Sequence, residues 1–184
     1  SMTAALKAGE PVELPSANTI ADGTAVKEVG DKVVPYVKEN VDDILLVDDD
    51  ELIGAFLDMV ENHKMIVENS GLLSVAALKQ MDIKGKKVVC VLSGGNMDVI
   101  TMSIVQHGLI QRDRIFSVSV LLPDKPGELA RVAQTVADVQ GNIIKLEHNQ
   151  FVSTNRNAAV ELRITMEAFG TDHKKKILDT LDKA

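Results

Sequence analysis

The sequence predicts an α/β fold made of two successive parts, and three patterns support this. A continuous apolar run over residues 88–92 leads into Ser-Gly-Gly-Asn and then into a helical pattern, the strand–loop–helix order of a parallel sheet. Further on, residues 158–167 alternate between apolar and polar side chains, as a half-buried antiparallel strand does. The polar stretch 111–114 separates the two patterns, so the predicted parts are residues 1–111 and 115–184.

The composition narrows the possible functions. The chain has 184 residues, of which 45% are hydrophobic and 26% are charged, the balance of a chain that buries a core. No apolar run approaches the roughly 20 residues of a membrane-spanning helix. The net charge of −7 argues against nucleic acid and anionic lipid as partners, because both are polyanions. A single cysteine and the lack of a signal-peptide pattern predict a cytoplasmic protein.

In the first part, residues 44–47 form a short apolar run that predicts a strand. The acidic residues 48–51 then precede a helical pattern over 52–60. Negative charge stabilises a helix N-terminus, so these acidic residues are interpreted as a cap. A calcium site is disfavoured, because such loops space their ligands over about a dozen residues around a turn glycine. A further helix is predicted from residue 72, before the apolar strand over 88–92.

The second part predicts the element order β-α-β-β-α. Strands are expected over 115–122, 142–148 and 158–167. The helix between the first two repeats apolar residues at i, i+3, i+4, i+7 and i+8 from Leu129, and Gly141 is expected to close it. Thr171 and Asp172 are expected to cap the last helix. This order is that of a ferredoxin-like unit that lacks its last strand.

The stretch best suited to ligand binding is Ser93-Gly94-Gly95-Asn96. Adjacent glycines let the backbone approach a ligand closely, and the serine and asparagine supply hydrogen bonds. A tight strand-to-helix turn, with Asn96 near the helix cap, explains the same residues. The stretch is neither a nucleophile elbow nor a phosphate-binding fingerprint.

No metal site is predicted. The four histidines, His63, His107, His148 and His173, stand alone, without cysteine or histidine neighbours at ligand spacing. Cys90 lies among valines and is expected to be buried and inert.

Four segments occur in an order that resembles a known family. They read Thr-Ile-Ala-Asp-Gly-Thr-Ala-Val over 19–26, Val-Asp-Asp-Ile over 41–44, Val-Glu-Asn-Ser-Gly over 67–71 and Val-Leu-Ser-Gly-Gly-Asn-Met-Asp over 91–98. The series resembles the second half of the catalytic domain of threonine ammonia-lyases, which are fold-type II, tryptophan-synthase-β-like pyridoxal-phosphate enzymes. Residues 115–184 resemble an ACT domain, whose first strand–helix loop reads Asp-x-Pro-Gly-x-Leu; here these are Asp124, Pro126, Gly127 and Leu129.

This resemblance implies roles for the glycine loop. Ser93 takes the position whose hydroxyl bonds the pyridine nitrogen of pyridoxal 5'-phosphate. Glu68 lies near the same ring edge, and Gly94, Gly95 and Asn96 shape that wall of the pocket. Asp22 and Gly23 match a hallmark near the cleft and are given a structural role. A neutral hydroxyl leaves the ring nitrogen largely unprotonated, which suits β-elimination better than transamination.

The resemblance also implies what the chain lacks. In the family, the Schiff-base lysine, the substrate loop and the phosphate-cradling loop lie in the N-terminal half of the catalytic domain. None of them is in this sequence, whose abrupt ends suggest a fragment. We therefore assign no catalytic residue, and we expect that this chain alone neither binds the cofactor nor acts as a lyase.

The second part predicts an effector site at Asp124, Pro126, Gly127, Glu128 and Leu129. Backbone amides at a helix N-terminus suit the carboxylate of an amino acid, and in the resembling enzymes the effector is isoleucine or valine. The alternative is that Pro126 and Gly127 only start a helix and that the domain only dimerises.

The resemblance implies part of a threonine ammonia-lyase, converting L-threonine to 2-oxobutanoate and ammonia in isoleucine biosynthesis or threonine catabolism, with allosteric regulation through the ACT domain. Two alternatives are a module that only self-associates and binds an amino acid, and a dehydratase that prefers L-serine. Residues 1–110 are expected to expose strand edges and apolar faces, so a homo-oligomer, a dimer through the second part, is predicted.

Overall fold

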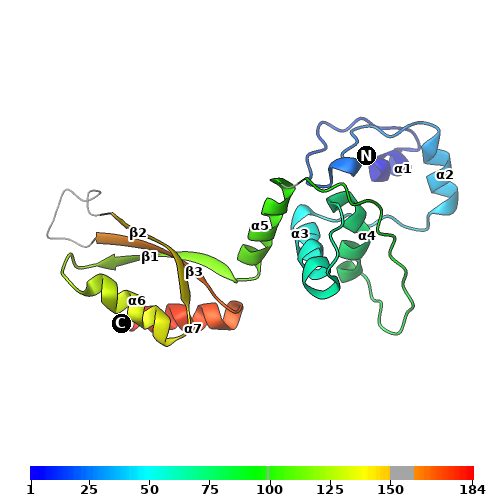
Figure 1. The fold of residues 1–184 in the computed structure, drawn as a ribbon. Coiled ribbons are helices and arrows are strands. Elements are labelled where there is room, and N and C mark those ends of the chain that lie inside the picture. The colour runs from blue at the N-terminus through cyan, green and yellow to red at the C-terminus, as the bar shows by residue number, and fades with distance from the viewer. Residues whose placement is uncertain (99, 150–159) are drawn as a thin grey trace. The chain divides into compact units, whose positions relative to one another are not determined.

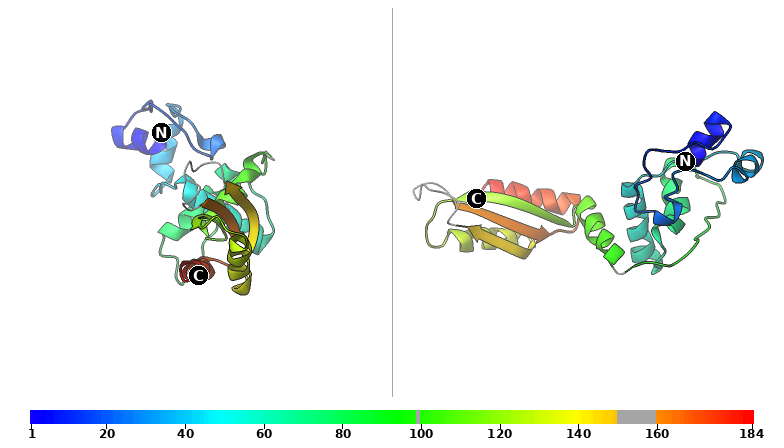
Figure 2. Two further views of the ribbon diagram at one scale, coloured as in Figure 1. Left: turned by 90° about the vertical axis from the view of Figure 1, so that its left-hand side faces the viewer. Right: turned by 90° about the horizontal axis from the view of Figure 1, so that it is seen from above.

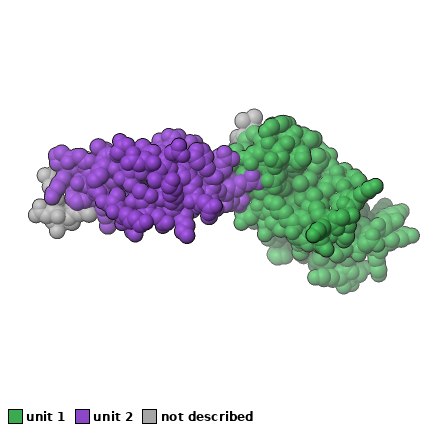
Figure 3. All heavy atoms as spheres, turned by 90° about the horizontal axis from the view of Figure 1, so that it is seen from below, with its two compact units in different colours: residues 1–105 green, residues 106–184 purple. Residues whose placement is uncertain are grey.

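The computed structural model describes residues 1–98, 100–149 and 160–184 (Figure 1). They form two compact units, residues 1–105 (unit 1) and residues 106–184 (unit 2), which Figure 3 colours separately. Unit 1 and unit 2 each have their own hydrophobic core. The predicted α/β class is confirmed, because the chain combines helices with a β-sheet.

The elements described in unit 1 are all helical. The α-helices are α1 (Met2–Ala8), α2 (Val33–Asn40), α3 (Asp49–Asp58) and α4 (Leu73–Ala76), and α5 (Ile104–Gln111) begins at its end. Short 3₁₀ or π turns are η1 (Asp22–Thr24), η2 (Met59–His63), η3 (Asn69–Leu72), η4 (Ala77–Gln80) and η5 (Ile100–Ser103). The core gathers apolar side chains of α3, η3, α4 and the loops around them: Ala21, Leu52, Ile53, Ala55, Phe56, Met59, Val67, Leu72, Ala76 and Ile104.

The predicted acidic cap of α3 is confirmed. The Asp48 carboxylate accepts a hydrogen bond from the Glu51 backbone N–H at 2.8 Å, and the Asp48 N–H donates to Glu51 Oε2 at 3.0 Å. This reciprocal pair satisfies two N–H groups that a helix N-terminus otherwise leaves unpaired. Asp48 and Glu51 therefore cap the helix.

The strands predicted over 44–47 and 88–92 are wrong, since both segments are irregular in the structure. A strand needs a neighbour that pairs with its backbone, and here side chains serve instead. Gln80 Nε2 donates to the Leu46 carbonyl at 2.7 Å, and Ser74 Oγ donates to the Val91 carbonyl at 2.9 Å. Val89 is 90% exposed. Unit 1 therefore has no parallel sheet among its described residues, and it leaves apolar side chains in water, as the sequence predicted.

Cys90 in the same segment also differs from its prediction. It is half-buried rather than buried, and its Sγ donates to the Ser74 carbonyl at 3.5 Å.

Unit 2 confirms the predicted β-α-β-β-α order. Its elements are β1 (Ile115–Leu122), α6 (Glu128–Asp138), β2 (Asn142–Asn149), β3 (Val160–Glu167) and α7 (Thr171–Asp182). The strands form an antiparallel sheet in the order β1-β3-β2. Figures 1 and 2 show α6 and α7 together on one face of this sheet. Alternation buries the apolar residues of β3 against these helices and leaves its polar residues outside.

The end of α6 differs from the prediction in one position. The left-handed residue is Gln140, with φ 64°, and not Gly141. The Gly141 N–H donates to the Val136 carbonyl and the Gln140 N–H to the Ala137 carbonyl, both at 2.9 Å, which is the Schellman pattern. Gly141 is required for another reason: a Cβ there would lie 2.7 Å from Val136 Cγ1.

The start of α7 is also not capped as predicted. Thr171 and Asp172 make no side-chain cap in the structure. Instead, Thr171 Oγ1 donates to Asp113 Oδ2 at 2.9 Å, and Lys174 Nζ donates to Asp113 Oδ1 at 2.6 Å. The Arg114 carbonyl accepts from the Ala168 N–H at 2.9 Å. These bonds tie the turn before β1 to the first turn of α7.

The Asp113 contacts predict a pH dependence. The hydrogen bond from Lys174, and then that from Thr171, lower the pKa of Asp113. A carboxyl group with a lowered folded pKa stabilises the fold above its unfolded pKa, about 3.9, and this stabilisation is lost as pH falls through the folded pKa. We expect Asp113→Asn to lower the melting temperature of unit 2 at pH 7 and to flatten its decline below about pH 4, in thermal scans followed by circular dichroism.

Asp179→Asn, on the exposed side of α7, is the matched control and should leave the pH profile of the wild type unchanged. An identical acid profile for wild type and Asp113→Asn would contradict the prediction.

Candidate functional site

A cavity of about 540 Å³ in unit 1 is the candidate cofactor site. Three segments that are far apart in the sequence line it, and these residues are Thr19, Ile20, Asp22, Glu68, Asn69, Asn96, Met97 and Asp98. Its volume is within the range of small-molecule sites.

Glu68 and the glycine loop meet at this cavity. The Asn96 backbone N–H donates to Glu68 Oε2 at 3.1 Å. Gly94 has φ 93°, and a Cβ there would lie 2.4 Å from Glu68 Cδ. Only glycine suits both the left-handed backbone and the close carboxylate. The structure therefore brings together Glu68, Gly94 and Asn96, three of the residues that the sequence singled out.

Gly71 packs closely against the backbone of the glycine loop. A Cβ on Gly71 would lie 2.4 Å from the Ser93 carbonyl oxygen and 3.0 Å from Val67 Cγ1. Ser93 itself is exposed and does not line the cavity, and a Cβ on Gly95 would meet no heavy atom within 4 Å. The loop is thus fixed through its contacts with Gly71 and Glu68, while Ser93 is exposed and Gly95 has free space around it.

Segment 19–22 also lines the cavity. Thr19 Oγ1 donates to Asp49 Oδ1 at 2.6 Å, and Asn69 Nδ2 donates to the Ile20 carbonyl at 2.9 Å. Asn69 is only 4% exposed. Sequence reasoning placed Asn69 within a motif but gave it no role, and it missed Asp49 as an anchor of this wall. Asp22 lines the cavity as predicted for a residue near the cleft, and a Cβ on Gly23 would lie 2.9 Å from Ser70 Oγ.

The residues of the cavity fit one part of a pyridine-based cofactor. The cavity volume of about 540 Å³ leaves space for a ring beside Glu68, whose carboxylate lies where a Cβ on Gly94 would be. The lining carries Asp22, Glu68 and Asp98 and no lysine or arginine. A ring can lie against such a wall, whereas a phosphate would be repelled by it. The cavity therefore suits the ring of the cofactor and not its phosphate.

The five predicted effector residues line one cavity of unit 2. It measures about 310 Å³, and its lining consists of Leu122, Pro123, Asp124, Lys125, Pro126, Gly127, Glu128, Leu129 and His148. Gly127 has φ 95° and precedes α6 as its N-cap residue. The Glu128 carboxylate accepts from Arg131 at 2.7 Å, so it is paired within the helix. His148 on β2 was missed, because β2 reaches this loop only through the sheet.

Two further observations concern metal binding and membrane spans. The described residues contain no group of three or more His, Cys, Asp or Glu side chains that could hold a metal ion. In the same residues, every helix is too short or too polar to cross a membrane.

Comparison with known proteins identifies a family for the first part of the chain. Residues 1–94 match the family model described as pyridoxal-phosphate dependent enzyme. The chain is similar to an L-threonine ammonia-lyase of Geobacter sulfurreducens, with 36% identity over 96% of this chain and 44% of that protein. It is also similar to an L-threonine ammonia-lyase of Thermotoga maritima, with 33% identity over 96% of this chain and 45% of that protein.

A solved structure is similar as well. The processed form of threonine deaminase isoform 2 from Solanum lycopersicum matches with a TM-score of 0.52 and 29% identity, over 58% of this chain and 32% of that chain. The chain spans less than half of the length of both bacterial relatives.

Proposed function

The chain belongs to the family of pyridoxal-phosphate dependent enzymes, whose model matches about half of it, and we propose that it is part of a threonine ammonia-lyase. Such an enzyme converts L-threonine to 2-oxobutanoate and ammonia. The similarity to two L-threonine ammonia-lyases along 96% of this chain supports the proposal. The structural observation that carries it is the glycine loop held against Glu68, because this is the wall that a cofactor ring needs.

Pyridoxal phosphate, when bound, supplies an electron sink for bonds broken at the α-carbon of an amino acid. The residues of this chain position the cofactor, and they do not supply the groups that react. Gly94 leaves room for the Glu68 carboxylate, and the Asn96 N–H holds that carboxylate in place. The resemblance assigns the Ser93 hydroxyl as the neutral hydrogen-bond partner of the pyridine nitrogen, although Ser93 is exposed and lies outside the lining of the cavity. The general base and the lysine that carries the cofactor come from outside this chain.

We further propose that residues 115–184 are an ACT-like regulatory unit. The cavity beside Gly127 would take the carboxylate of isoleucine or valine at the N-terminus of α6. Pairing of two copies through this unit would give a homodimer. A binding module without lyase activity is the second candidate, and it is favoured by the fact that this cavity is formed by unit 2 alone.

The test is to supply the missing part. The purified 184-residue chain, with threonine and added pyridoxal phosphate, is expected to form no 2-oxobutanoate, because the resemblance places the lysine that binds the cofactor outside this chain. Co-expression with the part of the Geobacter sulfurreducens enzyme that this chain does not match should restore formation of 2-oxobutanoate. Ser93→Ala in that complex should reduce kcat/KM about tenfold, the effect of one lost hydrogen bond.

Ser119→Ala, in unit 2, is the matched control and should retain full activity. Formation of 2-oxobutanoate by the chain alone, after its mass is verified, would contradict the prediction that the chain is inactive by itself. A folded complex that makes no 2-oxobutanoate from threonine, but makes pyruvate from serine, would contradict the assignment of threonine as the substrate.

A further inference from the structure

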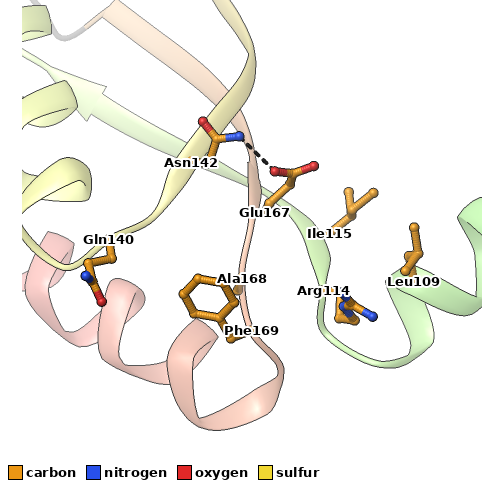
Figure 4. Close-up of a pocket in the computed structure, with 8 residues that line it drawn as sticks. All are labelled: Leu109, Arg114, Ile115, Gln140, Asn142, Glu167, Ala168 and Phe169. Atoms are coloured by element: carbon orange, nitrogen blue, oxygen red, sulfur yellow. Dashed lines mark hydrogen bonds between the residues drawn. The ribbon is translucent and has the colours of Figure 1, made fainter. Parts of the chain in front are cut away.

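A histidine of unit 2 joins the ends of two helices beside a small cavity. The cavity measures about 310 Å³ and lies at the end of the sheet opposite the β1–α6 loop (Figure 4). Phe169 lines it, and this side chain is 81% exposed. His173, in the first turn of α7, stacks its ring on that of Phe169, with centroids 4.8 Å apart and planes 14° apart. The aromatic wall of the cavity is therefore in direct contact with a side chain that can change its charge.

Both nitrogen atoms of the His173 ring are hydrogen-bonded to backbone groups. The Phe169 N–H donates to Nδ1 at 3.0 Å, and Nε2 lies 2.7 Å from the carbonyl oxygen of Val139, the C-cap residue of α6. A carbonyl oxygen only accepts, so Nε2 carries the ring proton and Nδ1 is the acceptor. This arrangement requires the neutral ring, because protonation would put an N–H on Nδ1 that faces the N–H of Phe169.

The surroundings of His173 do not force one charge state on its ring. The N-terminus of α7 disfavours a cation, whereas the C-terminus of α6, which accepts the Nε2 bond, favours one. Asp113 is paired with Lys174 at 2.6 Å. The elements that meet here carry charges of both signs: Asp113 and Arg114 before β1, Asp138 at the end of α6, Glu167 at the end of β3, and Asp172, Lys174 and Lys176 on α7. Neither backbone partner of the ring titrates, so the response to pH depends on the imidazole itself.

The backbone around Phe169 is fixed on both sides. The Ala168 N–H donates to the Arg114 carbonyl at 2.9 Å, and the Lys174 N–H donates to the Gly170 carbonyl at 2.9 Å. Gly170 has φ 116°, a conformation that glycine adopts and leaves without strain. Loss of the bond to Nδ1 would therefore free the backbone at 169–170 and leave β3 and α7 in place. The stacked rings can stay in contact, because an imidazolium is attracted to an aromatic face.

We propose that His173 is a pH-sensitive clasp in unit 2. Its neutral ring holds the Phe169 backbone to the C-terminus of α6. Protonation of Nδ1 releases the Phe169 N–H, while the Nε2 bond to Val139 is kept. The turn that carries the aromatic wall of the cavity is then free to move. This inference goes beyond the proposed function and requires neither a cofactor nor an effector.

The test is nuclear magnetic resonance on the ¹⁵N-labelled 184-residue chain at about pH 8 and about pH 5, the two sides of the range in which histidine changes charge. At the higher pH we expect a scalar coupling, transmitted through the hydrogen bond, between the Phe169 amide nitrogen and Nδ1 of His173. At the lower pH this coupling should be absent. Hydrogen exchange of the Phe169 amide, corrected for the intrinsic rate at each pH, should become about tenfold less protected, the effect of one hydrogen bond. The Ala168 amide is the internal control and should keep its protection.

Two variants distinguish the clasp from a general sensitivity to acid. In His173→Asn, the side-chain oxygen can accept from the Phe169 N–H without titrating, so the protection of this amide should be equal at both pH values. His107→Asn, at an exposed histidine of α5, is the matched control and should keep the response of the wild type.

The coupling in the wild type decides the proposal even if His173→Asn does not fold. A coupling that persists at about pH 5, or that is missing at about pH 8, would overturn it. Equal loss of protection at Ala168 and Phe169 would also overturn it, because the change would then be unfolding of the unit and not a local release.

Discussion

Replacing Gly71 by alanine is expected to lower the free energy of unfolding of unit 1 by about 3 kcal/mol, the upper part of the usual range for overpacking. The new methyl group would lie 2.4 Å from the Ser93 carbonyl oxygen and 3.0 Å from its carbon. These are backbone atoms, which cannot rotate away as the end of a side chain can. The loop would have to shift, and the bond from the Asn96 N–H to Glu68 would be strained with it. Urea unfolding followed by circular dichroism measures the loss.

Gly95→Ala provides the matched control two residues beyond Ser93. A methyl group there meets no heavy atom within 4 Å, and Gly95 is not among the residues with positive φ. The free energy of unfolding should therefore change by less than about 0.5 kcal/mol. Equal destabilisation by the two variants would show that the close approach of Gly71 to the Ser93 carbonyl is unimportant.

Ile164→Ala is expected to have the largest effect in unit 2, about 2–5 kcal/mol, because it removes a buried side chain from the middle strand. Ile164 is 0% exposed, and on β3 it lies between Val118 of β1 and Leu146 of β2. The melting temperature of unit 2 should fall by about 4–8 °C for each kcal/mol lost. Hydrogen exchange at the β3 amides of the whole chain reports this unit separately from unit 1.

The control is the same substitution on the neighbouring strand. Ile144 is 47% exposed and lies at the register shift between Ile143 and Lys145. Ile144→Ala should cost less than about 1 kcal/mol. If the two variants were equally destabilised, β3 could not be the centre of the core.

Unit 2 could be predicted closely because its signals are local. The alternation along β3 and the one-sided helix α6 each fit within a dozen residues. In unit 1 the same kind of signal failed. The apolar runs 44–47 and 88–92 report hydrophobicity, but they carry no information about whether a partner strand is present. Their neighbours in the structure are the side chains of Gln80 and Ser74.

The candidate site was predicted from resemblance rather than from periodicity. The meeting of Glu68 with Gly94 joins residues that no local pattern connects. The anchors Asp49 and Asn69 were missed for the same reason, since their partners in segment 19–20 are far away in the sequence. The shift from Gly141 to Gln140 had a different cause. Glycine was expected for its backbone freedom, whereas here it serves for close packing on Val136.

The two irregular apolar segments of unit 1 have a consequence for the colloidal behaviour of the chain. Such segments can stack between molecules into intermolecular β-structure. Each is flanked by charged gatekeepers: Asp42 and Asp43 before 44–47 with Asp48 after it, and Lys86 and Lys87 before 88–92. Their repulsion is screened by salt over about 10 Å at 0.1 M. Solutions of this protein should therefore stay clear at low ionic strength and become turbid, with growing thioflavin fluorescence, as salt is added.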